Sequence, residues 1–158
     1  MDVTIMLLIT SLIKLLESDF PQFIFKNSTS FSWSPSENTI HYNSSDKNSS
    51  ILLLHEISHA ILNHSNYQQD VELITMERNA WDKALELGIK YNVVISDDII
   101  ESTLDTYRSW LHERSTCPKC HANGIQEKKD SYKCIACGDR WRVNEARSCS
   151  LKRYQISQ

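Results

Sequence analysis

Hydrophobic and polar residues follow two different spacings along this chain. Over residues 3–16, apolar residues recur every three or four positions, which is the spacing of one face of an amphipathic helix. Three short stretches rich in aromatic and β-branched residues follow, at residues 23–25, 31–33 and 40–42, separated by turns of Asn, Ser and Pro. These stretches predict a small antiparallel sheet.

Helical spacing returns after residue 50 in three further segments. The expected helices span residues 51–63, 70–87 and 97–113. Ser49 or Ser50 is expected to cap the first of them and Ser96 the third, because serine side chains accept hydrogen bonds from the first turn of a helix. Gly88 is expected to end the second. The elements together predict the α+β class.

The charge of the chain changes sign near residue 114. Residues 1–113 carry 7 Lys and Arg against 16 Asp and Glu, which gives −9, while residues 114–158 carry 10 against 4, which gives +6. A chain of 158 residues can hold one compact core and a small appendage. We therefore predict a domain at residues 1–114, a small β module at 115–146 and a basic C-terminal tail at 147–158.

The apolar N-terminal stretch does not have the features of a signal peptide or a membrane span. It follows Asp2 where a signal peptide has basic residues, it contains Lys14, and it is shorter than the roughly 20 apolar residues of a span. Four of the five cysteines form two Cys-x-x-Cys pairs, which in such a chain indicates metal binding in a reducing compartment. We expect a cytoplasmic protein without a membrane partner.

The strongest chemical signal is an HExxH motif at residues 55–59, inside the first expected helix after the sheet. Histidines four positions apart lie on one face of a helix, so His55 and His59 can bind one metal ion, with Glu56 beside them. A zinc ion there would acidify its bound water, and Glu56 would act as the general base. The neighbouring residues are apolar, so these polar side chains would be costly to bury without a metal.

A catalytic zinc usually has a third protein ligand, and its identity assigns the class. The metzincin pattern requires Gly at position 62 and His at position 65, where this chain has Leu62 and Ser65. Glu77 lies in the middle of the apolar stripe of the next helix, where a carboxylate needs a partner that a zinc ion could supply. A buried ion pair of Glu77 with Arg78 or another base is the alternative.

The order of helix, short sheet and HExxH helix, followed by the segment 77–84 (ERNAWDKA), resembles the ImmA/IrrE-like metallopeptidases over roughly residues 1–111. The resemblance implies a minimal zincin-like domain and a gluzincin-like site, with His55, His59 and Glu77 as zinc ligands and Glu56 as the catalytic base. Members of that family often cleave or inactivate a repressor or another regulatory protein. A protein substrate is therefore implied by the resemblance.

Two cysteine pairs in the basic region predict a second, structural zinc. Cys117 and Cys120 are separated by thirteen residues from Cys134 and Cys137, and four thiolates can surround zinc tetrahedrally without leaving an open position. A redox role would explain one pair but not two. This zinc ribbon is similar to the C-terminal module of SprT-like proteases, which act on DNA-associated proteins. Their catalytic sites use a third histidine, for which His64 is the nearby candidate.

Many basic residues, interleaved with a few aromatic ones, lie in the ribbon region and after it, which makes nucleic acid a candidate partner. These residues are Lys119, Lys128, Lys129, Lys133, Arg140, Arg142, Arg147, Lys152, Arg153, Tyr132, Trp141 and Tyr154. In the alternative interpretation, the charges only solvate the ribbon or contact the acidic domain of the same chain. The fifth cysteine, Cys149, has no assigned role.

Together these features predict two zinc ions per chain and a zinc-dependent endopeptidase that acts on a regulatory or nucleic-acid-associated protein. Tyr67, Tyr107 and His64 are candidate donors to the oxyanion of a tetrahedral intermediate. The alternative is a non-catalytic adaptor or nucleic-acid-binding module in which the first zinc is structural. Glu56 favours the enzyme, because a purely structural site with two histidines would not need it.

Overall fold

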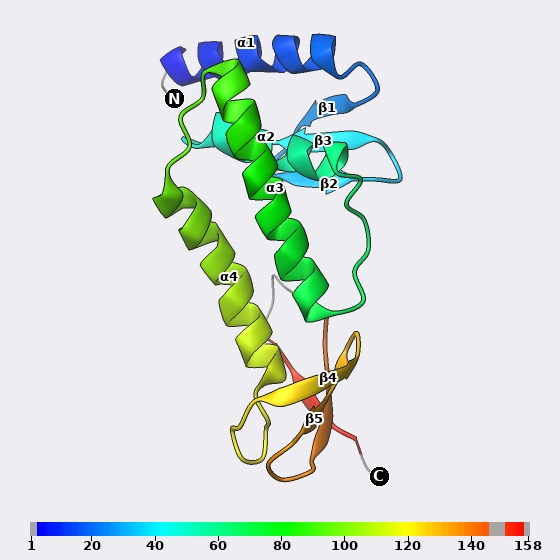
Figure 1. The fold of residues 1–158 in the computed structure, drawn as a ribbon. Coiled ribbons are helices and arrows are strands. Elements are labelled where there is room, and N and C mark those ends of the chain that lie inside the picture. Colours follow the sequence, from blue (N-terminus) through cyan, green and yellow to red (C-terminus); the bar gives the residue numbers. More distant parts are fainter. Residues whose placement is uncertain (1–2, 146–150, 157–158) are drawn as a thin grey trace. The chain divides into compact units, whose positions relative to one another are not determined.

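The computed structural model describes residues 3–145 and 151–156, with side chains from residue 9 onward (Figure 1). Its elements in chain order are α1 (Val3–Asp19), β1 (Ile24–Asn27), β2 (Ser32–Ser34), β3 (Thr39–Tyr42), α2 (Ser49–Ile61), α3 (Asp70–Tyr91), α4 (Asp97–Ser115), β4 (Gly124–Lys128), β5 (Ser131–Cys134), β6 (Arg140–Val143) and β7 (Arg153–Gln155). The predicted α+β class is confirmed. In the described part of the chain, no helix combines the length and apolar character that a membrane crossing requires.

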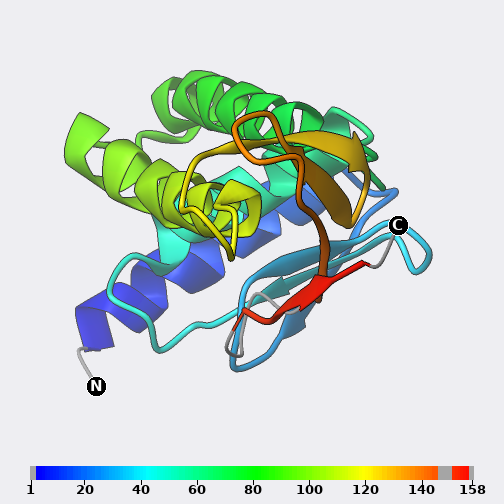
Figure 2. The ribbon, with the colours of Figure 1, turned by 90° about the horizontal axis from the view of Figure 1, so that it is seen from below.

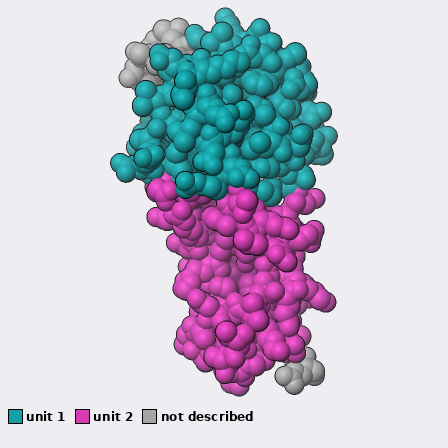
Figure 3. Space-filling view, viewed as in Figure 1, with its two compact units in different colours: residues 1–65, 76–100 teal, residues 66–75, 101–158 magenta. Residues whose placement is uncertain are grey.

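The chain divides into two compact units, which Figure 3 shows in different colours. Unit 1 consists of residues 1–65 and 76–100, and unit 2 of residues 66–75 and 101–158. Helices α3 and α4 therefore each contribute residues to both units. The domain boundaries expected at residues 114 and 146 stay predictions.

The sheet of unit 1 is mixed, with the strand order β1-β3-β2. Strand β3 pairs in parallel with β1, where Phe25 lies opposite Ile40, and antiparallel with β2, where Trp33 lies opposite Ile40. The expectation of a wholly antiparallel sheet was therefore wrong. Strand β3 carries the buried residues Thr39 and Ile40 and lies in the centre, whereas β1 is largely exposed at one edge.

The core of unit 1 is formed by α1, β3, α2 and the later part of α3. Its buried apolar residues include Ile9, Leu12, Leu16, Ile40, Leu53, Leu54, Ile57, Ala60, Ala80, Trp81, Ala84 and Leu87. Helix α2 begins at Ser49, and its N-cap is Asn48, which makes no side-chain capping bond. The serines expected to cap this helix thus lie inside it, and α2 is stabilised by its apolar face rather than by a cap.

Gly88 does not end α3, contrary to the prediction. A Cβ atom at this position would lie 2.7 Å from the carbonyl oxygen of Val93. The backbone N–H of Val93 donates to the carbonyl of Gly88 over 2.9 Å, so the chain leaving the helix folds back closely over this residue. The glycine is needed for that close approach, and the helix continues to Tyr91.

Unit 2 contains a four-stranded antiparallel sheet with the order β4-β5-β6-β7. Its core includes Tyr132 and Trp141, which lie opposite each other on β5 and β6 with ring centroids 5.6 Å apart. The region expected to be a basic tail supplies β7, drawn in red in Figure 2, where Tyr154 pairs with Arg142 of β6. Arg153 of the same strand donates to the carbonyls of Glu113 and Thr116.

Candidate metal centres

Three side chains predicted as zinc ligands come together in unit 1. His55 and His59 extend from successive turns of α2 and Glu77 from α3, and all three are buried. The Nε2 atom of His55 lies 3.1 Å from Nε2 of His59 and 3.2 Å from Oε2 of Glu77, and His59 Nε2 lies 3.6 Å from the same oxygen. This arrangement, which we call the His-His-Glu group, could hold a metal ion.

These separations fit a small metal ion with nitrogen and oxygen ligands. Ligand atoms about 2.0 to 2.2 Å from a tetrahedral zinc are about 3.3 Å from one another. The observed values of 3.1, 3.2 and 3.6 Å lie around that distance. The alternative of a buried ion pair between Glu77 and Arg78 does not describe this site, because Arg78 is exposed and lies 3.6 Å from Asp82.

The carboxylate of Glu77 is held in its ionised form. Burial raises the pKa of this group, but hydrogen bonds from His55 and His59, together with their charge, outweigh that effect and lower the pKa to about 2. The group therefore offers two imidazole nitrogens and one anionic oxygen. This donor set is common in zinc sites that leave a fourth coordination position open.

Glu56 lies on α2 beside the His-His-Glu group without being part of it. Its side chain is partly buried, and burial raises the pKa of its carboxyl. A hydrogen bond from the backbone of Trp33, on β2, favours the carboxylate. The role of Glu56 as a general base stays a prediction.

The two histidines of the group are held in different ways. The ring of His55 stacks on the indole of Trp81, with centroids 4.2 Å apart and an interplanar angle of 23°. In the part of the chain that the structure describes, the buried Nδ1 atom of His55 has no hydrogen-bond partner. The Nδ1 atom of His59, in contrast, lies 2.9 Å from Nδ1 of His64.

His64 is therefore next to His59 but outside the His-His-Glu group. The structure brings Glu77, and not the histidine of an SprT-like site, together with the two HExxH histidines. Burial, followed by the charge of His59, lowers the pKa of His64. The indole N–H of Trp33 donates to the backbone carbonyl of His64 over 3.0 Å. The contact with Trp33 was not anticipated, since nothing in the sequence relates a short strand to a loop 31 residues later.

The other two candidate oxyanion donors, Tyr67 and Tyr107, belong to unit 2. Tyr67 is partly buried, and the ammonium of Lys129 lies 5.4 Å from the centre of its ring. Tyr107 is partly buried on α4. The roles suggested for Tyr67, Tyr107 and His64 at the oxyanion stay predictions.

The four cysteines of the two pairs form a second candidate metal centre, in unit 2. The Sγ atoms of Cys117 and Cys137 are 3.7 Å apart, and those of Cys120 and Cys134 are 3.5 Å apart. All four thiols are free, and their spacing is far from the roughly 2.05 Å of a disulfide bond. It is close to the separation of about 3.8 Å expected between thiolates around a tetrahedral zinc.

Each cysteine pair is built on the same turn. The residue after the second cysteine, His121 or Gly138, has a left-handed backbone with φ of 61° or 78°. Its N–H donates over 3.0 Å to the carbonyl of the first cysteine of the pair. Backbone N–H groups of Cys137 and Ala136 lower the pKa of the Cys134 thiol to about 7, which favours the thiolate that binds metal.

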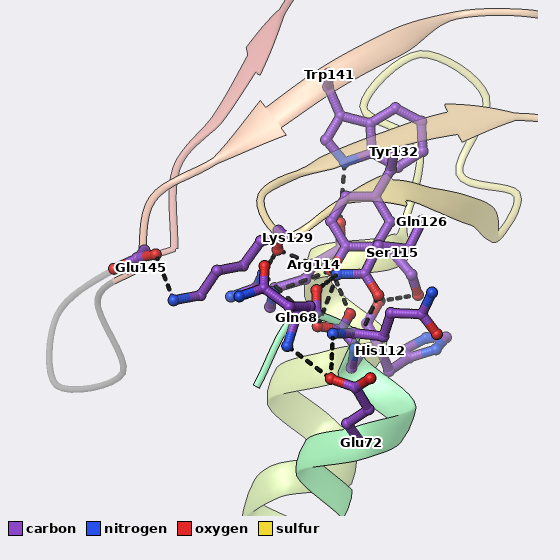
Figure 4. A network of polar contacts seen from close by, with 12 residues as sticks. Gln68, Glu72, His112, Arg114, Ser115, Gln126, Lys129, Tyr132, Trp141 and Glu145 are labelled. Atoms are coloured by element: carbon purple, nitrogen blue, oxygen red, sulfur yellow. Dashed lines mark hydrogen bonds and ion pairs between the residues drawn. The ribbon is translucent and has the colours of Figure 1, made fainter. Parts of the chain in front are cut away.

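A polar network fixes the ribbon to other parts of unit 2 (Figure 4). Arg114, only 1% exposed, donates to the hydroxyl of Tyr132 over 3.0 Å and to the carbonyl of Lys129 over 2.7 Å, and lies 3.6 Å from Asp70. The hydroxyl of Tyr132 donates to Asp70, and the indole of Trp141 donates to the carbonyl of Arg114. This network was not predicted, because Arg114 looked like one of many basic residues.

Several basic residues proposed for nucleic-acid binding have acidic partners within unit 2. Arg140 lies 3.0 Å from Glu127, and Arg142 lies 2.7 Å from Asp130. Lys129 lies 3.3 Å from Glu145. Arg147 and the unassigned Cys149 lie outside the described residues. Nucleic-acid contact stays a prediction, and these ion pairs occupy three of the basic residues on which it rests.

No protein-family model, curated protein or solved structure matches this chain. The zincin-like interpretation of unit 1 therefore rests on the His-His-Glu group and on the elements that build it. The interpretation of the ribbon rests on the geometry of the four cysteines.

Proposed function

We propose that this protein is a zinc-dependent endopeptidase. The observation that carries the proposal is the convergence of His55, His59 and Glu77 in one buried group, with Glu56 next to His55 on the same helix. An HExxH helix with a glutamate from the following helix is the donor set of a gluzincin-like peptidase site. Bound there, zinc would supply a Lewis acid that activates water and polarises a peptide carbonyl.

The side chains of the protein itself would handle the protons. The carboxylate of Glu56, hydrogen-bonded by the backbone of Trp33, would accept a proton from the attacking water and deliver it to the leaving nitrogen. Trp81 would keep the imidazole of His55 in place by stacking on it. None of these roles needs a side chain from unit 2.

The position of β2 supports a peptide as the substrate. This strand is at the edge of the sheet order β1-β3-β2, and its residue Trp33 contacts Glu56. An edge strand has backbone groups that an extended peptide can pair with. We propose that the cleaved chain lies along β2, which would bring its backbone close to Glu56.

The choice of substrate protein rests on the resemblance to ImmA/IrrE-like enzymes. That resemblance makes a repressor or another regulatory protein the candidate substrate. The similarity of the ribbon to that of SprT-like proteases adds DNA-associated proteins as candidates. We propose that the four-cysteine zinc is structural. It would hold unit 2 in the form that contacts such a partner.

The test is peptide cleavage by three zinc-loaded proteins: the wild type, Glu56→Gln, and the control Glu17→Gln, which alters an exposed residue on α1. A library of proteome-derived peptides, read by mass spectrometry, serves as the substrate. The wild type and Glu17→Gln should cleave equally, and Glu56→Gln should be at least about 100-fold slower because it lacks the base. Equal cleavage by Glu56→Gln would remove Glu56 from the mechanism. Two bound zinc ions without cleavage by the wild type would favour the adaptor.

A further inference from the structure

The turn that follows α2 brings a third histidine beside one of the two in the HExxH motif. Asn63 has a left-handed backbone with φ of 53°, and its N–H donates to the carbonyl of Ala60 over 3.1 Å. The next N–H, that of His64, donates to the carbonyl of His59 over 2.9 Å. These two bonds are those of a Schellman motif, in which the residue after the left-handed position packs against the residue five positions earlier.

In most such motifs that side-chain contact is apolar, whereas here two imidazoles meet. The Nδ1 atoms of His59 and His64 are 2.9 Å apart, and their ring centroids are 5.0 Å apart. Trp33 also binds this turn, because its indole N–H donates to the carbonyl of His64. His64 is therefore fixed both by the end of α2 and by β2.

The other ring nitrogen of His59, Nε2, decides which of the two histidines donates the hydrogen bond between their Nδ1 atoms. Its Nε2 atom faces His55 and Glu77, so Nε2 is the atom that would bind a metal. The proton of the neutral ring then lies on Nδ1, which must donate it. The acceptor at 2.9 Å is Nδ1 of His64.

Histidines that bind metals usually donate their second N–H to a carboxylate, a carbonyl or water, and this bond fixes the tautomer and the ring orientation. We infer that His64 is the positioning residue for His59, accepting its Nδ1 proton so that Nε2 stays directed at the His-His-Glu group. This inference rests on the proposed function. It does not make His64 a metal ligand, because the Nδ1 atom of His64 contacts Nδ1 of His59, whereas the metal would be bound by Nε2 of His59.

The experiment compares metal binding by His64→Phe and His64→Asn in the full chain. Phenylalanine keeps a ring but has no acceptor, while the amide oxygen of asparagine can occupy the place of Nδ1. Affinity is measured by competition of Zn²⁺ with a chromogenic chelator. The Co²⁺ absorption spectrum distinguishes the His-His-Glu group from the four cysteines. Cobalt at the cysteines shows sulfur charge-transfer bands, which cobalt bound to histidine and glutamate lacks. His64→Phe should lose about 10- to 100-fold in affinity and shift the cobalt spectrum, and His64→Asn should restore most of both.

Wild-type affinity and an unchanged cobalt spectrum in His64→Phe would overturn the inference. An equal loss in His64→Phe and His64→Asn would also overturn it, because the effect would then come from the missing imidazole and not from the acceptor. Glu77→Ala provides the reference for the proposed function. If it retains two metals per chain, the His-His-Glu group is not a metal site; if it loses one while His64→Phe binds normally, only the role of His64 fails.

Discussion

Trp81 lies against the imidazole of His55, with the two rings nearly parallel and their centroids 4.2 Å apart. Trp81 is fully buried on α3, about one turn after Glu77 on the same helix. One helix thus supplies both a candidate metal ligand and the surface that orients another. The packing of α2 against α3 and the geometry of the His-His-Glu group are therefore set by the same residues.

Replacing Trp81 by alanine should destabilise the protein by about 3 to 5 kcal/mol, because the substitution would leave a cavity in the core of unit 1. Urea unfolding of the zinc-loaded protein measures the loss. The control Ile89→Ala, at a side chain 87% exposed on the same helix, should change the free energy of unfolding by less than about 0.5 kcal/mol. A similar small change in Trp81→Ala would contradict the packing described for His55.

Replacing Glu77 by glutamine should reduce the zinc content from two ions per chain to one after equilibrium dialysis. Glutamine has nearly the same shape but no charge, and the ionised carboxylate, with a pKa of about 2, is the anionic member of the group. Zinc content is measured by atomic absorption. Glu86→Gln, at an exposed position of α3, should keep both ions. Two ions in both variants would exclude Glu77 as a ligand.

Replacing Cys134 by serine should unfold the ribbon, since a structural zinc supplies much of the folding free energy of so small a module. The indole proton of Trp141, which is bonded to the carbonyl of Arg114, should lose its distinct NMR signal. A strong chelator should have the same effect on the wild type. Cys149→Ser should leave the signal unchanged, because Cys149 belongs to neither of the two Cys-x-x-Cys pairs in the sequence. A folded ribbon in Cys134→Ser would show that the metal is dispensable.

Replacing Arg114 by methionine should cost about 3 to 5 kcal/mol, because it leaves Asp70 and the carbonyl of Lys129 without their buried partner. The matched control is Arg108→Met, whose exposed pairs with Glu101 and Asp105 should contribute about 0.5 kcal/mol. Denaturant unfolding compares the two. If both variants lost equally little, Arg114 would not organise unit 2.

Tyr132 should make the protein less stable at alkaline pH. Burial and the hydrogen bond to Asp70 raise the pKa of its hydroxyl, whereas tyrosine in the unfolded chain titrates near pH 10. The folded state retains a proton that the unfolded chain releases, so this contribution is complete below about pH 10 and falls as the pH rises further. The decline should be shallower in Tyr132→Phe and unchanged in Tyr154→Phe, whose side chain is 55% exposed. Identical alkaline profiles for all three proteins would rule out this contribution.

The sequence predicts best those features that depend on short spacings within one element. The histidines of α2 and the cysteine pairs could be assigned because four- and three-residue spacings fix their geometry. Glu77 could be assigned because a carboxylate on an apolar helix face needs a partner. Predictions failed, or could not be made, for features that depend on residues distant in the sequence. The prediction that Gly88 ends α3 was wrong, because the sequence pattern does not show its close contact with Val93.

The burial of Arg114 could not be predicted from the sequence either. In the sequence it is one cation among several, and its burial depends on Asp70, which precedes it by more than forty residues. The parallel pairing of β1 with β3 likewise depends on which strand becomes central, and three short strands of similar composition do not reveal that order. Spacing predicted which histidines and cysteines come together in the two candidate metal centres, but not the contacts that orient these side chains.

The two cysteines within each pair differ in their access to solvent: Cys117 and Cys134 are buried, whereas Cys120 and Cys137 are exposed. An oxidant or a competing chelator would therefore meet one sulfur from each pair first. A metal ion could lose these two exposed sulfurs first, while the two buried cysteines still hold it. Its release would then need no prior unfolding of the sheet. The rate of metal exchange at the ribbon would then be set by the reactivity of two surface thiolates rather than by the global stability of the protein.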